Sequence, residues 1–230
     1  MKWYSQTKEN VSFFGSRPTL SRLDAFLCKY MGNLGHRLGG DVLPHAGNTL
    51  QCLRSARGLQ VHKKFRYWEF DVHESKDGEL IVFHDDLITR GSKAIELHQL
   101  DADEIRRVGL EEHEIEIPTL SQVLEALGKT EKPVRVEIKN LHSDIGKMKF
   151  IDLVANAKEK FQWNCKVIAW KDRFRKIFPS DERERWQKEF SHRGLSVCRV
   201  GLHHVDLFKA HSTTVGRMMF VLGLGPLSKR

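Results

Sequence analysis

Residues 67–72 alternate strictly between apolar and ionisable side chains, which is the pattern of a half-buried β-strand. Trp68, Phe70 and Val72 are the apolar positions, and Glu69 and Asp71 lie between them. Successive side chains of a strand point to opposite faces, so the two carboxylates share one face. The predicted strand therefore has one apolar and one anionic face.

The same pattern recurs at two other places. An Asp77-Gly78 turn signal leads into a second apolar run that ends at His84 and Asp85, which predicts a hairpin. Further along, residues 134–139 alternate again, and Glu137 and Lys139 share a face opposite three branched aliphatic residues. Several predicted strands thus carry charge on one face only.

Strand and helix patterns alternate along the chain. This order is typical of a parallel sheet with helical crossovers. Strands are predicted up to His36, around Glu69 and His84, and over 133–140, 165–170, 195–201 and 217–225, with helices over 20–31, 48–58, 117–128, 145–161 and 182–194 and a polar stretch over 86–116.

Charge on one strand face separates two architectures. An open sheet covered by helices requires apolar residues on both faces, whereas a barrel can turn polar residues into the mouth at the carboxyl ends of its strands. We therefore expect a TIM-like parallel (β/α) barrel. Seven strand candidates, one fewer than eight, predict an irregular or incompletely closed barrel in which residues 217–223 pair beside the first strand or leave a gap there. The expected domains are an N-terminal extension over 1–33 with a short helix, and the barrel over 34–230.

Composition adds the class of partner and the compartment. The 230 residues and 40% hydrophobic content suffice for a full core, and the formal net charge of +8 favours anionic partners. No segment has the length of a membrane span or the features of a secretory signal. The four cysteines have no disulfide-framework or metal spacing, so we expect reduced thiols in a cytoplasmic protein: Cys28, Cys52, Cys165 and Cys198.

The carboxylates Glu69, Asp71 and Glu137 raise a physical problem, because three such groups in an enclosed mouth repel one another and lose hydration. A cation should hold them, and oxygen ligands alone favour Mg²⁺ or Ca²⁺ over zinc. The alternative is a set of solvent-facing charges on an antiparallel sheet. The nearby Lys139 and His84 at other strand ends favour the metal site.

Six ordered fragments resemble the glycerophosphodiester phosphodiesterase family, part of the PLC-like phosphodiesterase superfamily. They run from Gly35 to Asn140 in the family's order and spacing. The fragments are "GHRLGG" at 35–40, "GNTL" at 47–50, "EFDV" with its "KDG" turn at 69–78, "FHDD" at 83–86, "IPTL" at 117–120 and "VEIKN" at 136–140.

This resemblance implies an enzyme that cleaves glycerophosphodiesters, or lysophospholipids, to an alcohol and a glycerol phosphate. His36 and His84 match the family's catalytic histidines, and Arg37 and Lys139 match the residues that hold the phosphate. Glu69, Asp71 and Glu137 match the ligands of a divalent cation. Histidines that transfer protons near neutral pH suit such a reaction. We expect a small-molecule substrate, no nucleic acid partner, and at most a peripheral membrane contact.

Three departures from the family pattern leave an alternative open. Leu38 replaces a glycine, Gly47 replaces a glutamate, and no Trp-Thr-x-Asn signature precedes Arg230. Gly39 and Gly40 can supply the turn after His36-Arg37 one residue later. The loss of the carboxylate at 47 motivates the alternative of a catalytically weak or inactive barrel that binds a phosphorylated ligand or partner.

Overall fold

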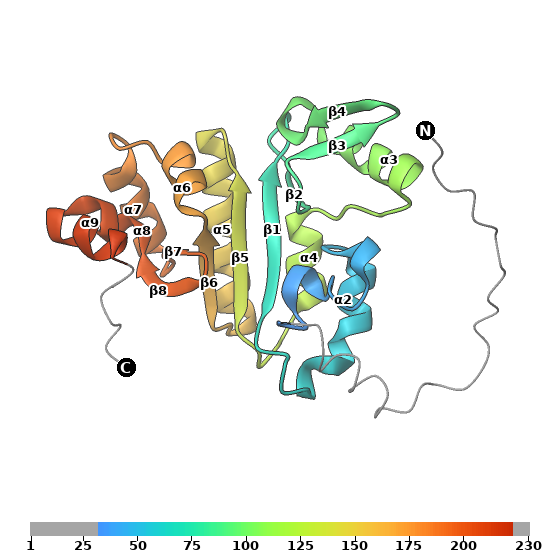
Figure 1. Cartoon of the computed structure of the whole chain (residues 1–230), viewed down its shortest axis with the longest axis horizontal. Helices are drawn as coiled ribbons and strands as arrows, with labels where there is room; N and C mark the ends of the chain where they lie inside the picture. The colour runs from blue at the N-terminus through green and yellow to red at the C-terminus, as the bar shows by residue number, and fades with distance from the viewer. Residues whose placement is uncertain (1–31, 223–230) are drawn as a thin grey trace. The chain divides into compact units, whose positions relative to one another are not determined.

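The computed structural model describes residues 32–222, so the helix predicted over 20–31 lies outside the described residues. Six strands form one mostly parallel sheet in the order β2-β1-β5-β6-β7-β8 (Figure 1). The two end strands, β2 and β8, run antiparallel to their neighbours. The bounds are β1 Trp68–Glu74, β2 Leu80–Val82, β5 Val134–Asn140, β6 Cys165–Ala169, β7 Val197–Arg199 and β8 Leu202–Asp206.

Among the described residues, no pairing joins β2 to β8, so the sheet does not close. This arrangement confirms the predicted mostly parallel, incompletely closed barrel architecture. The four inner strands of the parallel set are β1, β5, β6 and β7.

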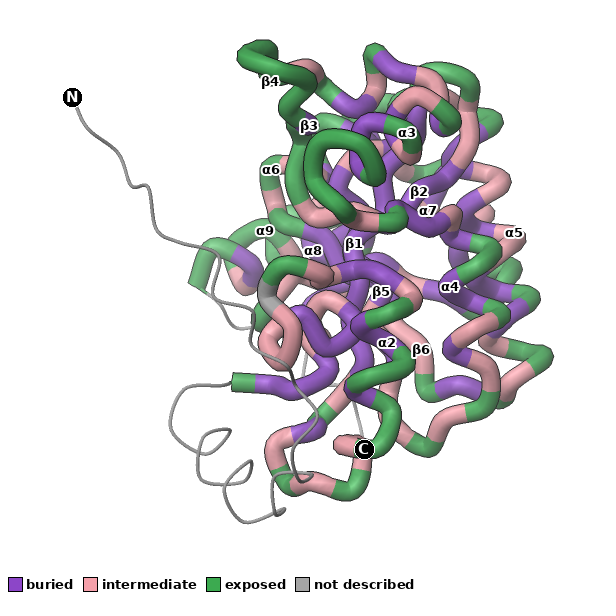
Figure 2. The backbone as a smooth tube through the Cα atoms, turned by 90° about the vertical axis from the view of Figure 1, so that its right-hand side faces the viewer, coloured by how far each residue is buried: buried purple, intermediate pink, exposed green. Residues whose placement is uncertain are grey.

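Apolar side chains fill one face of the central strands, as their alternation predicts. Phe70 and Val136 are neighbours in the β1–β5 register and are fully buried. On this side lie α4 (Leu120–Leu127) and α5 (Asp144–Phe161), and Figure 2 shows the central strands buried between layers. The α4 helix begins with a capping box in which Thr119 and Gln122 satisfy each other's backbone N–H groups.

Residues 86–116, expected as a polar stretch, contain regular structure. They form a two-stranded sheet of β3 (Leu87–Arg90) and β4 (Lys93–Glu96), the 3₁₀ turn η4 (Leu97–Gln99) and α3 (Ala102–His113). Buried aliphatic residues of these elements, with Ile81 and Ile117, form a separate core cluster. Each of these elements contributes only a few apolar residues to the cluster and exposes the rest. The segment therefore has a mostly polar sequence although it is folded.

Two strand predictions at the ends of the domain are wrong. Residues 33–35 are not a strand, and His36–Leu38 form the 3₁₀ turn η1, in which Arg37 and Leu38 have φ of 50° and 57°. Left-handed residues cannot continue a strand, so only single hydrogen bonds such as Glu69 N–H to the Gly35 carbonyl, 2.9 Å, reach β1. The chain then forms η2 (Pro44–Ala46), α2 (Leu50–Ala56) and η3 (Arg57–Val61). Helix α2 confirms the helix predicted over 48–58.

The strand predicted over 217–225 is also wrong where the structure describes it. Residues Thr214–Val221 form helix α9, whose N-cap Thr213 accepts a hydrogen bond from the Gly216 N–H. Residues 217–222 therefore do not pair beside the first strand. Before α9 come α6 (Lys171–Ile177), α7 (Arg183–His192), β8 and α8 (Leu207–Ser212), of which only α7 was predicted.

Candidate active site

The three acidic residues of the central strands converge on one point. Parallel pairing sets Asp71 of β1 beside Glu137 of β5 in register, and Glu69 lies two residues before Asp71 on the same face. One carboxylate oxygen from each of Glu69, Asp71 and Glu137 lies within 4.8 Å of the others, and all three residues are buried. The strand register alone thus brings together groups that are 68 residues apart in sequence.

Two neighbouring side chains partly compensate these carboxylates. Lys139 Nζ lies 3.0 Å from Asp71 Oδ1 and 2.7 Å from Glu137 Oε1. The Asn48 amide donates a hydrogen bond of 2.8 Å to Asp71 Oδ2. Burial by itself lowers the pKa of Lys139, but the two carboxylates raise it further, so the net shift is upward and the ammonium stays charged.

Glu69 is the least compensated of the three carboxylates. Its Oε2 accepts the Arg37 backbone N–H at 3.0 Å, while its buried Oε1 has no hydrogen-bond partner among the described residues. Burial first, and the charge of Asp71 second, raise the pKa of Glu69 well above its ordinary value. Burial likewise raises the pKa of Glu137, against the effect of Lys139.

This donor set fits a hard divalent cation. An unpartnered buried carboxylate oxygen and two carboxyl groups with raised pKa values are what a cation at this point would relieve. Oxygen-only ligands suit Mg²⁺ and Ca²⁺. The residues that could hold such an ion are Glu69, Asp71 and Glu137.

His36 stands at the edge of this cluster. Its Nδ1 lies 3.1 Å from Asp41 Oδ1, and its Nε2 lies 3.7 Å from Glu69 Oε2. The side chain is 43% exposed, so one ring edge remains open to a ligand. A carboxylate on Nδ1 orients the imidazole.

His84 has the same kind of arrangement on the other side of Arg37. Its Nδ1 lies 2.6 Å from Asp85 Oδ1, and its Nε2 lies 2.6 Å from Arg37 Nη2. Arg37 thus contacts both parts of the site, the carboxylates through its backbone and His84 through its guanidinium. Two histidines, each paired with a carboxylate, therefore lie on either side of Arg37.

One pocket of about 340 Å³ is lined by all seven residues predicted from the sequence. Its remaining wall comes from β1, β6 and the β7–β8 region, which the sequence did not single out for the site. The seven are His36, Arg37, Glu69, Asp71, His84, Glu137 and Lys139, and the others are Tyr67, Ile168, Trp170, Val200, Gly201 and His203.

Sequence reasoning missed several of these neighbours. Asn48 belongs to the "GNTL" fragment, so its place beside Asp71 was open to inference from the motif. His203 belongs to none of the fragments that resemble the family, yet it lines the pocket, and burial lowers its pKa. No local pattern marks Asp41, because its role depends on the turn that returns it to His36.

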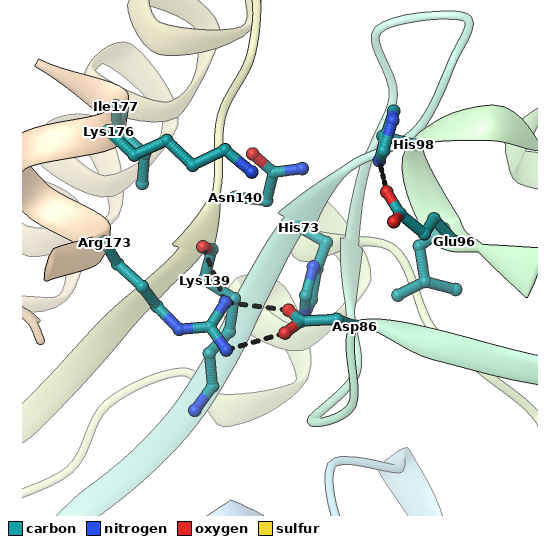
Figure 3. A pocket seen from close by; sticks show the side chains of 10 residues that line it. His73, Asp86, Glu96, His98, Lys139, Asn140, Arg173, Lys176 and Ile177 are labelled. Atoms are coloured by element: carbon teal, nitrogen blue, oxygen red, sulfur yellow. Dashed lines mark hydrogen bonds and ion pairs between the residues drawn. The ribbon is translucent and has the colours of Figure 1, made fainter.

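A second, smaller pocket of about 130 Å³ shares Lys139 with the first (Figure 3). Arg173 of α6 crosses it and forms a two-pronged ion pair with Asp86, at 2.7 and 2.8 Å, while also donating to the Lys139 carbonyl at 3.0 Å. These bonds fix the end of β5 next to the catalytic pocket. The hydrogen bonds from Arg173 lower the pKa of Asp86.

Leu38 and Gly47 show how the chain accommodates its departures from the family pattern. Leu38 itself adopts the left-handed conformation with φ of 57°, and Gly39 follows with φ of 97°, so the turn is not simply shifted by one residue. A Cβ on Gly47 would lie 3.5 Å from Arg37 Cβ, an ordinary contact. Gly47 has φ of −53°, so a side chain would fit there without strain.

Comparisons with known proteins match this geometry with a family. A model described as the glycerophosphoryl diester phosphodiesterase family matches residues 36–198. A comparison with curated protein sequences finds no match.

Solved structures give distant matches. An Oleispira antarctica phosphodiesterase in complex with the product sn-glycerol-3-phosphate has a TM-score of 0.39 and 18% identity over 78% of this chain and 76% of that one. A Thermotoga maritima glycerophosphodiester phosphodiesterase has a TM-score of 0.42 and 17% identity over 74% and 85%. The chain spans only 61% of a Silicibacter pomeroyi structure, with a TM-score of 0.45 and 13% identity over 68% of this chain. These likenesses are too distant to add to the family match.

Proposed function

Since the chain belongs to the glycerophosphoryl diester phosphodiesterase family, we propose that it hydrolyses glycerophosphodiesters in the pocket of His36 and His84. The observation that carries this proposal is the pocket itself. It combines three buried carboxylates, two basic side chains and two histidines within about 340 Å³. Proton-transfer groups, fixed cations and metal-binding carboxylates can each contribute to cleavage of a phosphodiester.

Each side chain has a task that follows from its position. Arg37 and Lys139 offset negative charge on the phosphate as it develops in the transition state. One histidine takes a proton from the attacking hydroxyl or water, and the other returns a proton to the departing alcohol. Asp41 and Asp85 orient the two rings through the Nδ1 contacts. The site therefore supplies an acid and a base on either side of the Arg37 guanidinium.

Metal dependence is part of the proposal. Glu69, Asp71 and Glu137 would hold Mg²⁺ or Ca²⁺, and the unpartnered Glu69 Oε1 supports this assignment. When bound by these residues, a divalent cation would polarise phosphoryl oxygens and offset their charge. Lys139 remains in contact with two of the carboxylates and limits their mutual repulsion.

The proposal also covers the class of substrate and the cellular compartment of the protein. The substrates are glycerophosphodiesters or lysophospholipids, which share the glycerol phosphate group that the basic side chains would bind. None of the helices between residues 32 and 222 combines the length and apolarity needed to cross a bilayer. The cytoplasm is proposed from the sequence alone, as is the absence of a nucleic acid partner.

The test is release of alcohol from glycerophosphocholine, glycerophosphoinositol and a lysophospholipid by the purified chain. We expect turnover that a chelator abolishes and that added Mg²⁺ or Ca²⁺ restores. Turnover insensitive to a chelator would contradict the metal assignment. Negligible turnover on every diester, together with binding of glycerol phosphate, would favour the inactive binding module instead.

A further inference from the structure

Helix α9 (Thr214–Val221) presents an apolar face to solvent. At 100° per residue, Val215, Met218, Val221 and the C-cap Leu222 fall on one arc that lies away from the buried Phe220. This α9 face consists of Val215, Met218, Val221 and Leu222, which are 71, 61, 75 and 59% exposed. Four large apolar side chains on one short helix are more than isolated surface residues, so the face requires an explanation.

Cations surround the base of this helix. Lys171 Nζ lies 4.8 Å and Arg199 Cζ lies 5.2 Å from the centroid of the Phe220 ring, on the side where α9 meets the domain. Arg217 is on α9 itself, next to the apolar arc, and its charge interacts with that of Arg183. The ring centroid of His211 lies 5.2 Å from that of Phe220, with the rings tilted. Burial, and then the neighbouring cations, lower the pKa of His211 to about 4.

The cationic groups outnumber the acidic ones near them. Arg175 forms an ion pair with Asp172 at 3.9 Å, and Asp181 lies near Arg183. Five cations stand against these two carboxylates, in a chain whose formal net charge is +8. The five are Lys171, Arg175, Arg183, Arg199 and Arg217.

This surface adjoins the rim of the catalytic pocket. Trp170 lines that pocket and is 53% exposed. The next residue, Lys171, contacts Phe220 of α9. In Figure 1 both α6 and α9 lie on the β6–β8 side of the sheet, with α9 farther out. An exposed indole, an apolar helix face and excess positive charge thus occur side by side.

We propose that the α9 face and its five cations dock the protein on the surface of an anionic phospholipid bilayer. An apolar helix face flanked by Lys and Arg is the combination that lies in the headgroup region, because apolar side chains enter the acyl boundary while cations bind lipid phosphates. A second copy of the chain fits less well, since it would bring the same excess positive charge against itself. The proposal rests on this surface and not on the proposed hydrolysis.

The experiment is co-sedimentation of the full chain with vesicles of phosphatidylcholine alone and of phosphatidylcholine mixed with phosphatidylserine. We expect binding to the mixed vesicles that weakens with added salt. The double variant Met218→Gln/Val221→Gln should lower the partition coefficient by about tenfold or more, given the apolar area that each side chain would bury. The separate variant Arg217→Glu should weaken binding to mixed vesicles only.

The matched control is Ile145→Gln, which removes a 79% exposed apolar residue from α5 and should leave binding unchanged. Hydrolysis of a soluble glycerophosphodiester should be equal in all variants, so a failure of the membrane proposal is distinguishable from a failure of the enzymatic one. Wild-type protein that ignores mixed vesicles would overturn the proposal. Equal binding by the double variant, or a dimer in sedimentation velocity that the double variant dissociates, would overturn it as well.

Discussion

Apolar side chains are usually buried and ionisable ones exposed, and the centre of the sheet and its C-terminal edge depart from this rule in opposite ways. In β1, all seven residues are buried, including the carboxyl groups of Glu69 and Asp71. At the edge, β7 has three residues, and α9 exposes large apolar side chains such as Val221. Charge is kept inside where a phosphate and a cation would compensate it, and apolar surface is kept outside where a lipid surface would cover it. Each departure from the rule thus indicates a binding site.

The largest expected effect separates the histidines of the centre from one at the edge. His36→Ala or His84→Ala should each lower kcat by roughly 10²–10⁴, since each removes one proton-transfer group. His204→Ala is the control, because this exposed residue of β8 does not line the pocket. Steady-state assays on a glycerophosphodiester measure the effect. Full activity in both catalytic variants would refute the assigned roles.

Removing a buried aromatic side chain should cost more unfolding free energy at the centre of the sheet than at its edge. Phe70→Ala removes a fully buried side chain of β1 and should cost about 3–5 kcal/mol of unfolding free energy. Phe220→Ala at the edge should cost less, because α9 can open locally without unfolding the sheet. Urea denaturation gives both values. Equal losses would show that α9 belongs to the cooperative core.

Glu74 tests how the centre handles a buried charge outside the catalytic pocket. This fully buried carboxylate accepts the His142 and Ser143 N–H groups, at 2.7 and 3.0 Å, where α5 begins. Glu74→Ala should therefore cost about 1–3 kcal/mol, because buried donors lose their acceptor. Glu125→Ala, which breaks an exposed ion pair with Lys160, should cost about 1 kcal/mol or less. Urea denaturation of both variants compares them, and similar losses would contradict the account.

The smallest effect concerns the start of α9. Thr213→Ala removes the N-cap hydrogen bond to Gly216 and should destabilise the helix by about 1 kcal/mol. Faster amide exchange confined to residues 214–221 would show it, with exchange in β1 and β5 unchanged. Slower vesicle docking should accompany it. Exchange that rises across the whole sheet would mean that the edge and the centre unfold together.

The same contrast explains which features could be predicted. Strict alternation in β1 and β5 reflects burial against helices on one side, so the faces that carry Glu69 with Asp71 and Glu137 with Lys139 follow from sequence, whereas the register that sets Asp71 beside Glu137 does not. Residues 217–221 carry the apolar run expected of a strand but form a helix, in which Phe220 is buried, Met219 is half-buried and the other three are exposed. His203 and Asp41 reach the site through turns, whose course depends on tertiary contacts. The domain boundary near residue 33 stays a prediction.

The central claim is that the three carboxylates form a cation site at a cost to folding. Burial and the charge of Asp71 raise the pKa of Glu69 in the folded state, so the metal-free protein should lose stability as pH rises from about 4.3, the unfolded value, to that raised pKa. Glu69→Gln should flatten this profile.

Unfolding midpoints in urea, with a chelator and with excess Mg²⁺ or Ca²⁺, test that claim most directly. The wild-type protein should gain about 2.7 kcal/mol when free metal exceeds its Kd a hundredfold, and Glu69→Gln should gain much less at the same concentration. A wild-type midpoint that metal leaves unchanged, or an equal gain in Glu69→Gln, would contradict the account.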